Sequence, residues 1–369
     1  MSNHDSTITV TKKDQLQSIL SVFPKESKFA FGYGSGVFIN ENSMIDMILC
    51  VENVTKWHDT NLATNRDHYA TLPMMLGSNF ISAVQELGAG CYFNPMVKIK
   101  LNDNDDNNND EEELTSQRLV KYGVISESRL KHDLMEWDTM YIAGRMHKPT
   151  VPLETISDCS SRDEIIQLQE DYNLRFAVAT GLLLLPHQKL ANRDTTTVLE
   201  EDLYKCIAGL SYIGDPRMAL GAEDPNKVNK LVSSLGQYDR FQKLYHGQLS
   251  QLEKKGLISR MKSLQGDVIE INLMDPATVR ELHSNIPQRV QSQTMTQFSP
   301  FVGRRIMTTS ESSIAWEDVS LFSSQLSNTM GRIIRHPARI QSIKGIVTAG
   351  VAKSVQYVSA KLSKGILRK

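Results

Sequence analysis

The chain lacks several features that would assign it to a class at once. Its 369 residues include only four cysteines, and none forms a Cys-x-x-Cys pair. This scarcity argues against a zinc site and against a disulfide-built secreted fold. No apolar run approaches the roughly 18 residues that a membrane-spanning helix needs. The opening residues, MSNHDSTITVTKK, have neither a secretory apolar core nor an Arg-rich transit-peptide pattern. We therefore expect a chain from a reducing compartment that does not span a membrane.

Net charge is also nearly absent, but the balance conceals an asymmetry. The chain has 41 basic and 42 acidic residues, which gives a formal charge of −1. The segment from Val319 to Lys369 contains nine Lys or Arg and no Asp or Glu, so the rest of the chain carries −10. An acidic body without a basic groove does not favour nucleic acid as a partner. The basic end favours an anionic surface.

Hydrophobic patterning predicts an α+β chain. Short apolar runs bounded by polar residues are typical of strands, and longer mixed segments are typical of helices. A helical stretch followed by a hairpin, here Gly256–Leu273, indicates a winged-helix-like module. The segment Asn102–Glu113 (NDNDDNNNDEEE) has no apolar residue and predicts a disordered loop. The expected strands are Met44–Val51, Tyr92–Leu101 and Arg118–Ile125, and the expected helices include Glu127–Tyr141, Arg162–Leu185 and Lys227–Lys255.

A glycine-rich turn is the most informative local motif. Gly34-Ser35-Gly36 is followed, eleven positions after the serine, by Asp46 within an expected strand. Such a turn exposes backbone N–H groups to a triphosphate, and an Asp on a neighbouring strand can hold Mg²⁺. The pattern resembles the start of the nucleotidyltransferase superfamily motif, although a plain turn is the alternative. That superfamily places a second acid two residues after the first, where this chain has Ile48.

Charged residues gather again between residues 121 and 149 and near residue 217. Acids beside an Arg-His-Lys run suit a metal and polyphosphate site, because Arg can bind phosphate oxygens in pairs and Lys acts as a point charge. The alternative is a solvated helix with surface ion pairs. The residues are Lys121, Tyr122, Asp133, Glu136, Asp138, Arg145, His147 and Lys148, followed by Arg217 in the turn GDPRM.

The C-terminal segment, Ala338–Lys369, predicts an amphipathic helix. Apolar residues recur at steps of three and four, from Ile340 and Ile343 to Ile366, and lysines such as Lys344 are expected to flank that stripe. Basic helices of this kind lie in the plane of an anionic membrane surface. Packing against a partner or a core is the alternative. We favour membrane adsorption because the segment contains no acid.

Sequence blocks that occur in order from Phe31 to Tyr245 resemble one family. They are FGYGSGVF, MIDMI, WHDTNLATNRDHY, VKYGVIS, DLMEWDTMYIAGRMHKP, LLLLP, DLYKCIAGLSYIGDPRM and KLVSSLGQYDRFQKLY. The resemblance is to the mitochondrial-type phosphatidate cytidylyltransferases, also called CDP-diacylglycerol synthases or translocator assembly and maintenance proteins. It implies condensation of CTP with phosphatidic acid, dependent on Mg²⁺, that feeds cardiolipin synthesis. It also implies a peripheral protein on the matrix side of the mitochondrial inner membrane.

The same resemblance implies an architecture. A nucleotidyltransferase-type domain with a mixed sheet is expected at residues 1–190, a helical winged-helix-like domain at 191–300, and a basic amphipathic membrane-associating tail at 301–369. The resemblance also implies roles for the motif residues. The expected catalytic residues are Asp46, Lys121, Asp133, Asp138 and Lys148; the nucleotide-binding residues are Gly34, Ser35, Gly36, Tyr122, Arg145, His147 and Arg217; and the Mg²⁺ ligands are Asp46 with Asp133, or Asp138, as the second acid.

Two other functional classes stay open at this point. A nucleic-acid nucleotidyltransferase shares the Gly-Ser turn and a helical partner domain, but the acidic body of this chain argues against it. A non-catalytic assembly factor for membrane import machinery is the other, and an intact CTP site would argue against that. Oligomeric state, acyl-chain preference and lipid entry route have no signal in the sequence.

Overall fold

The structure, a computed structural model, describes residues 12–39, 43–101, 116–155, 159–189, 197–219, 224–264, 266–297, 306–310 and 314–366. The acidic segment Asn102–Glu113 lies outside these residues. Two compact units are defined by their internal contacts. Unit 1 comprises Met1–Leu130, Thr150–Ile165 and Ile340–Lys369, and unit 2 comprises Lys131–Pro149 and Ile166–Arg339. The three-part sequence division at residues 190 and 300 stays a prediction.

Unit 1 is built on a mixed five-stranded sheet in the order β3-β4-β2-β1-β5. β2 is parallel to β4, whereas the other pairings in this sheet are antiparallel. The central strand β2 is almost wholly apolar and buried, as a strand covered on both faces requires. The expected α+β class and mixed sheet are thus confirmed. The strands are β1 (Ser27–Tyr33), β2 (Ile45–Val51), β3 (Cys91–Leu101), β4 (Ser116–Ser126) and β5 (Thr150–Leu153).

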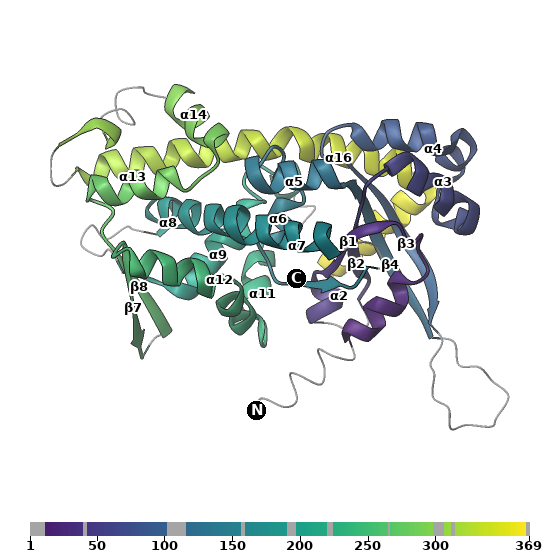
Figure 1. Cartoon of the computed structure of the whole chain (residues 1–369), viewed down its shortest axis with the longest axis horizontal. Helices are drawn as coiled ribbons and strands as arrows, with labels where there is room; N and C mark the ends of the chain where they lie inside the picture. The colour runs from purple at the N-terminus through teal and green to yellow at the C-terminus, as the bar shows by residue number, and fades with distance from the viewer. Residues whose placement is uncertain are drawn as a thin grey trace. The chain divides into compact units, whose positions relative to one another are not determined.

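Helices cover the sheet of unit 1. Residues 12–20 form a helix whose Leu16 and Ile19 are fully buried in the core beside β1 and β2. The short helix α2 (Ser35–Phe38) follows β1 directly. Helices α3 (Val54–Thr64) and α4 (Thr71–Glu86), separated by the 3₁₀ turn η1 (Arg66–His68), pack on each other and on the β3–β4 half of the sheet (Figure 1).

Unit 2 is mainly helical. A continuous helix runs through α7 (Cys159–Leu168), the π-helical segment η2 (Gln169–Leu174) and α8 (Arg175–Lys189), and its burial increases from α7 to α8; α7 begins in unit 1. The other helices are α5 (Glu127–Glu136), which also begins in unit 1, α6 (Ala143–Met146), α9 (Glu200–Leu210), α10 (Pro216–Ala219), α11 (Lys227–Ser233), α12 (Gln237–Lys254), α13 (Pro276–Ser284) and α14 (Gln288–Gln297).

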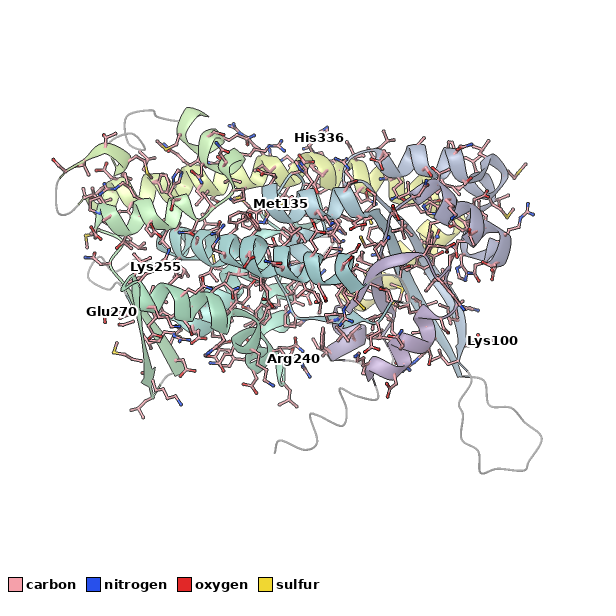
Figure 2. All side chains as sticks on the ribbon, in the orientation of Figure 1. Lys100, Met135, Arg240, Lys255, Glu270 and His336 are labelled. Carbon is pink, nitrogen blue, oxygen red and sulfur yellow. The ribbon has the colours of Figure 1, made fainter. Side chains whose placement is uncertain are left out.

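A small sheet follows the helices of unit 2. β7 (Ile258–Ser263) and β8 (Gly266–Ile271) form the expected hairpin, and β6 (Thr197–Leu199) adds a third strand beside β8. Arg240 and Lys255 mark the two ends of α12, and Glu270 lies on β8 of the adjoining hairpin (Figure 2). The hairpin follows α12 directly in the chain, and β7 contacts α12.

Two expected helices are shorter than the sequence pattern predicted. The helix expected over Glu127–Tyr141 ends at Glu136, because Trp137 and Met140 both adopt left-handed backbone conformations with φ of 52°. The helix expected over Lys227–Lys255 is divided into α11 and α12. Gly236 separates them in a left-handed conformation with φ of 71°, which glycine adopts without steric cost.

The C-terminal helix is longer than expected. α16 spans Trp316–Ile366 and so begins 22 residues before Ala338; its first part belongs to unit 2 and the part from Ile340 belongs to unit 1. The expected place of Lys344 on a cationic flank is wrong, because Lys344 is only 4% exposed. Its Nζ donates to the backbone oxygens of Gln85, Leu87 and Cys91, at 2.9, 2.8 and 3.1 Å, where α4 ends. An ammonium placed there satisfies carbonyls that the helix end leaves unpaired.

Within the described residues, no helix is both long enough and apolar enough to cross a bilayer.

Gly36 is a position where packing demands glycine. A Cβ there would lie 2.2 Å from the backbone oxygen of Met44. We expect Gly36→Ala to lower the free energy of unfolding by about 2 kcal/mol or more, because backbone must move to admit the methyl group. Gly345→Ala is the matched control, since Gly345 lies in α16 with nothing within 4 Å of its Cβ position. Denaturant unfolding of both variants checks this; equal stabilities would contradict it.

Candidate active site

Strand register brings the first group of predicted residues together in unit 1. Tyr33, the last residue of β1, pairs with Asp46 on β2, and Asp46 pairs in turn with Lys121 on β4. Gly34 and Ser35 follow Tyr33 directly. The glycine turn, the carboxylate and the lysine therefore form one row across three adjacent strands, just after the end of β1, near the start of β2 and in the middle of β4.

The turn itself needs its glycine. Gly34 has φ of 83° and ψ of −174°, a region that only glycine adopts readily. A Cβ on Gly34 would lie 3.4 Å from Asp46 Oδ2, so the turn passes close to that carboxylate. Gly34 precedes α2, whose four residues include the predicted Ser35 and Gly36. The sequence pattern thus correctly located a tight turn against an acid.

Asp46 and Lys121 form the charged pair of this row. Lys121 Nζ lies 3.7 Å from Asp46 Oδ1, and the two side chains are 21% and 24% exposed. Lys121 Nζ also lies 4.9 Å from the centroid of the Phe93 ring. Both charges are therefore accessible to a ligand while their positions are restricted by neighbours.

The composition of this row decides how a metal ion could bind. Ile48, at the usual position of a second acid, is fully buried, and no cluster of three or more His, Cys, Asp or Glu side chains occurs in the described ranges. Mg²⁺ is commonly held by one or two carboxylates together with substrate phosphates and water. A single carboxylate, Asp46, beside a phosphate-binding turn fits that mode, in which the nucleotide supplies further ligands.

Tyr122 lies elsewhere. It is fully buried, and its hydroxyl accepts hydrogen bonds from Asn61 Nδ2 at 2.9 Å and Asn94 Nδ2 at 2.7 Å. Burial is the largest cause that raises the pKa of this hydroxyl well above its ordinary 10.0. Since adjacent residues of a strand point to opposite faces, Tyr122 cannot share the face of Lys121. This geometry argues against direct nucleotide contact by Tyr122.

Asp133 supports a loop in unit 2. The side chain is 3% exposed, and its two oxygens accept five hydrogen bonds. Oδ1 accepts from Thr139 N, Thr139 Oγ1 and Met140 N, each at 2.9 Å, and Oδ2 accepts from Ile142 N and Ala143 N at 3.0 and 2.9 Å. A carboxylate occupied in this way is not available as a metal ligand. It instead holds residues 137–143, with their two left-handed positions, in place.

Asp138 and His147 also have structural partners. Asp138 pairs with Arg289 of α14. His147 is fully buried, with Nε2 2.9 Å from Asn173 Oδ1, and its backbone oxygen accepts from Tyr245 at 2.7 Å. Burial, followed by the charge of Lys148, lowers the pKa of His147 to about 3. His147 is therefore neutral and positions the segment around it.

The loop that Asp133 holds leads into a cluster of cations in unit 2, which we call the cation cluster: Arg145, Lys148, Arg217 and Lys227. Arg145 stacks on the Tyr141 ring at 4.0 Å, and Tyr212 contacts two ammonium groups, Lys148 Nζ at 5.1 Å and Lys227 Nζ at 5.2 Å from its ring centroid. Arg217 binds Asp215 through two nitrogens, Nε at 3.1 Å and Nη2 at 2.7 Å. Attraction to these aromatic rings restrains the positions of the cations.

Repulsion within the cation cluster makes it receptive to anions. Lys148 is half-buried, and its Nζ donates to Gly144 O at 2.6 Å and Ser211 Oγ at 2.9 Å. Desolvation, followed by the charges of Arg145 and Lys227, lowers the pKa of this ammonium well below its ordinary 10.5. A bound phosphate would offset both effects, because an opposite charge favours the protonated amine.

Several members of this group had no signal in the sequence. Lys227 lies outside the quoted sequence blocks, and Tyr141 and Tyr212 lie inside two of them without a phosphate-binding pattern of their own. Only the fold brings these residues into the cation cluster. Asn173 is placed by the π-helical segment η2, where it also accepts from Trp137 Nε1 at 2.7 Å. A π-helical turn inside a longer helix is rare and marks functional sites, but no residue pattern announces it.

Comparison with known proteins gives the family of the chain. A family model described as mitochondrial phosphatidate cytidylyltransferase matches residues 16–364. The chain belongs to this family. Proteins named mitochondrial phosphatidate cytidylyltransferase are similar to it over nearly all of its length. The one from Xenopus laevis is 35% identical over 95% of this chain and 94% of its own, and the one from Schizosaccharomyces pombe is 35% identical over 97% and 85%.

Membership of the phosphatidate cytidylyltransferase family makes the protein a nucleotidyltransferase enzyme, as the sequence blocks indicated. A relative from Mus musculus with the same name is 33% identical over 95% of the chain. The family model covers β1, the glycine turn, both strands that carry Asp46 and Lys121, and the cation cluster. The matched residues therefore include those of the candidate site.

Asp133 gives a test of the loop that precedes the cation cluster. We expect Asp133→Asn to lower the free energy of unfolding by about 3 kcal/mol or more, because the amide group faces N–H donors and hydrogen bonds to a charged acceptor are lost. Asp171→Asn is the matched control, since Asp171 is exposed on η2. Denaturant unfolding compares the two; an Asp133→Asn variant as stable as the control would show that the loop does not depend on this carboxylate.

Proposed function

We propose that the protein transfers the cytidylyl group of CTP to phosphatidic acid in a membrane, giving CDP-diacylglycerol and pyrophosphate. The observation that supports it best is the row in unit 1 where the Gly34 turn approaches Asp46 and Lys121. Family membership supplies the substrate class, since the relatives are named for phosphatidate and cytidylyl transfer.

The reaction is a direct displacement at phosphorus. A phosphate oxygen of phosphatidic acid forms a bond to the α-phosphorus of CTP, the bond from that phosphorus to the β-phosphate oxygen breaks, and pyrophosphate leaves with the electron pair. No covalent enzyme intermediate is needed, so the chain contributes positioning and charge stabilisation. The Gly34 turn and the Ser35 hydroxyl bind the triphosphate, and Lys121 offsets its charge.

Mg²⁺ is the proposed cofactor, with Asp46 as its protein ligand. It would supply charge neutralisation on the triphosphate oxygens. Asp46 lies beside Lys121, so the Lys121 ammonium and a bound Mg²⁺ would both interact with the Asp46 carboxylate. Binding the nucleotide therefore requires that Lys121 move its interaction from Asp46 to phosphate.

The cation cluster of unit 2 is the proposed second group that binds phosphate. Arg145 and Arg217 present planar guanidinium groups, which suit phosphate oxygens in pairs, and Lys148 and Lys227 act as point charges. Asp215 is the acid that restrains Arg217. The cluster thus has the charge to hold pyrophosphate or a phosphomonoester.

The finer assignments follow from the same resemblance. We propose that unit 1 contains a nucleotidyltransferase-type domain. We also propose that α11, α12 and the β7–β8 hairpin with β6 form a winged-helix-like module, because helices followed by a small three-stranded sheet are its pattern. The proposed location is the matrix side of the mitochondrial inner membrane, where the product feeds cardiolipin synthesis. The acid-free end of α16 is the proposed peripheral contact with anionic lipid.

Asp46 gives the direct test of the reaction. With CTP, phosphatidic acid vesicles and Mg²⁺, we expect Asp46→Asn to lower the rate of CDP-diacylglycerol formation by about 100-fold or more, because charge stabilisation in the transition state is lost. Glu52→Gln is the control: Glu52 follows the same strand at its other end and pairs with Lys28 on the surface.

Product formed equally by both variants would move the essential acid elsewhere. A folded wild type that makes no product, yet adsorbs to vesicles, would favour the non-catalytic assembly role.

Lys227 gives the test of the cation cluster. We expect Lys227→Met to weaken pyrophosphate binding about tenfold at neutral pH, because a charge-assisted contact is lost. The same change raises the pKa of Lys148 by removing a neighbouring charge. Binding weakens as Lys148 deprotonates at alkaline pH, so this loss should begin at higher pH in the variant than in the wild type. Isothermal titration calorimetry against pH measures both effects.

Lys243→Met, which removes an exposed lysine of α12, is the control and should change neither the affinity nor the pH profile. Equal behaviour of the two variants would exclude Lys227 from the anion site.

A further inference from the structure

Helix α4 belongs to an unusually charge-poor part of the chain. From Tyr69 to Val97 the sequence contains a single formally charged residue, Glu86. A helix on the surface of a water-soluble protein normally presents charged and polar residues outward. α4 instead exposes large apolar side chains: Leu72 is 54% exposed, Met75 73%, Leu76 51%, and Leu87, the C-cap residue, 55%. We call these four residues the α4 patch.

Helical spacing places the exposed side chains of the first turns together. Leu72, Met75 and Leu76 stand at positions i, i+3 and i+4, which share one helix face. Gly77 then interrupts the helix with φ of 80°, and its Cβ position has nothing within 4 Å. The buried residues of α4, which are Pro73, Ile81, Ser82 and Gln85, contact the rest of unit 1. Pro73 and Met74 of the first turns thus pack toward the core, while Leu72, Met75 and Leu76 are exposed.

The other end of α4 adjoins α16. Lys344 Nζ donates to Leu87 O at 2.8 Å, and Ile340 would lie 2.8 Å from a Cβ on Gly88. Ile343, one residue before Lys344, is 65% exposed. The exposed side chains of Leu87 and Ile343 thus flank one junction within unit 1. The charge at this end is small, since Glu86 Oε2 lies 3.6 Å from Arg129 Nε.

Two exposed leucines of unit 2 offer a comparison with the α4 patch. Leu235 and Leu264 are 97% and 108% exposed, but each stands in a turn between elements of unit 2. Single exposed leucines are normal on soluble proteins, whereas a grouped apolar face marks an interaction site. These two residues serve as internal comparisons for the α4 patch.

We propose that the α4 patch, together with Ile343, inserts into the interfacial layer of an anionic lipid bilayer. Two observations favour lipid as the occupant. Ile343 belongs to α16, and from Val319 to the C-terminus the sequence contains no acid and eight Lys or Arg besides the buried Lys344, a charge that attracts anionic lipid. The relatives are also named for a lipid substrate.

A second contact with the membrane adds affinity that does not depend on charge. A single basic amphipathic helix binds membranes reversibly, and its affinity depends on salt because charge attraction contributes much of it. The α4 patch contributes by apolar burial, which salt screening does not weaken. It also holds unit 1, which carries Asp46 and Lys121, at the lipid surface where phosphatidic acid resides. This part of the inference rests on the proposed function.

Vesicle binding of the full chain tests the proposal. The variant Leu72→Ser/Met75→Ser/Leu76→Ser is compared with Leu235→Ser/Leu264→Ser by flotation with vesicles of phosphatidylcholine and phosphatidic acid. We expect the first variant to lose at least about tenfold in partition coefficient, with the same factor at low and high salt, because apolar burial is lost. The second variant should bind like the wild type. A chain ending at Gly350 is the reference for the charged tail, and its loss should shrink as salt rises.

A fluorescent label provides a measurement that does not depend on a triple substitution. Cys159 is the exposed free cysteine, so Cys159→Ser gives the background. An environment-sensitive dye on Met75→Cys should shift to the blue on vesicles, and the same dye on Leu264→Cys should not.

Unchanged partitioning of the α4 variant, equal losses in both serine variants, or equal dye shifts at both positions would each overturn the proposal. Turnover of a water-soluble short-chain phosphatidic acid is measured in parallel. A normal rate there with lost vesicle binding supports the α4 patch, whereas no turnover by the wild type would refute the proposed function instead.

Discussion

Strand pairing across β1, β2 and β4 is the constraint on which the candidate site depends. β2 is antiparallel to β1 and parallel to β4, so the residue after β1 and residues within β2 and β4 meet at one level of the sheet. A slip of one residue in either pairing would turn the side chain of Asp46 or Lys121 to the opposite face. The buried apolar run of β2 fixes this register, because its side chains are covered on both faces.

Much of this part could be predicted from the sequence. A short apolar run such as MIDMILCV is typical of a buried strand. A turn that contains Gly34 and Gly36, followed by an acid on a strand, is typical of a phosphate-binding site. The turn at Ser35 and the strand position of Asp46 were predicted in this way, and their roles in binding stay a prediction. Tyr122 was misjudged because a sequence block does not tell which face of a strand a residue occupies, and adjacent positions on a strand face opposite ways.

The second group was less predictable for a different reason. Its residues come from a loop, a π-helical turn and the starts of several helices, and these meet only through tertiary packing. Asp133 was predicted to be a metal ligand because a carboxylate can either bind a metal ion or accept hydrogen bonds from a loop. Its five hydrogen bonds, four of them from backbone N–H groups, show that this carboxylate stabilises the loop after α5. Helix ends were missed where left-handed residues, Trp137, Met140 and Gly236, interrupt an otherwise helical pattern. Such interruptions cost local energy that the surrounding structure must offset, and no propensity scale anticipates them.

The buried ammonium of Lys344 also has a rotational consequence for the end of the chain. Its hydrogen bonds to three carbonyls, with the one from Gln341 to Cys91 O, fix the rotation of α16 about its own axis within unit 1. Each further residue of an α-helix advances by about 100° around that axis. One residue inserted just after Thr348 would therefore turn every later apolar position of α16 by that angle, whereas seven residues would nearly restore the original direction. The direction in which the tail presents its apolar positions thus depends on Gln341 and Lys344 and on the number of residues that follow them.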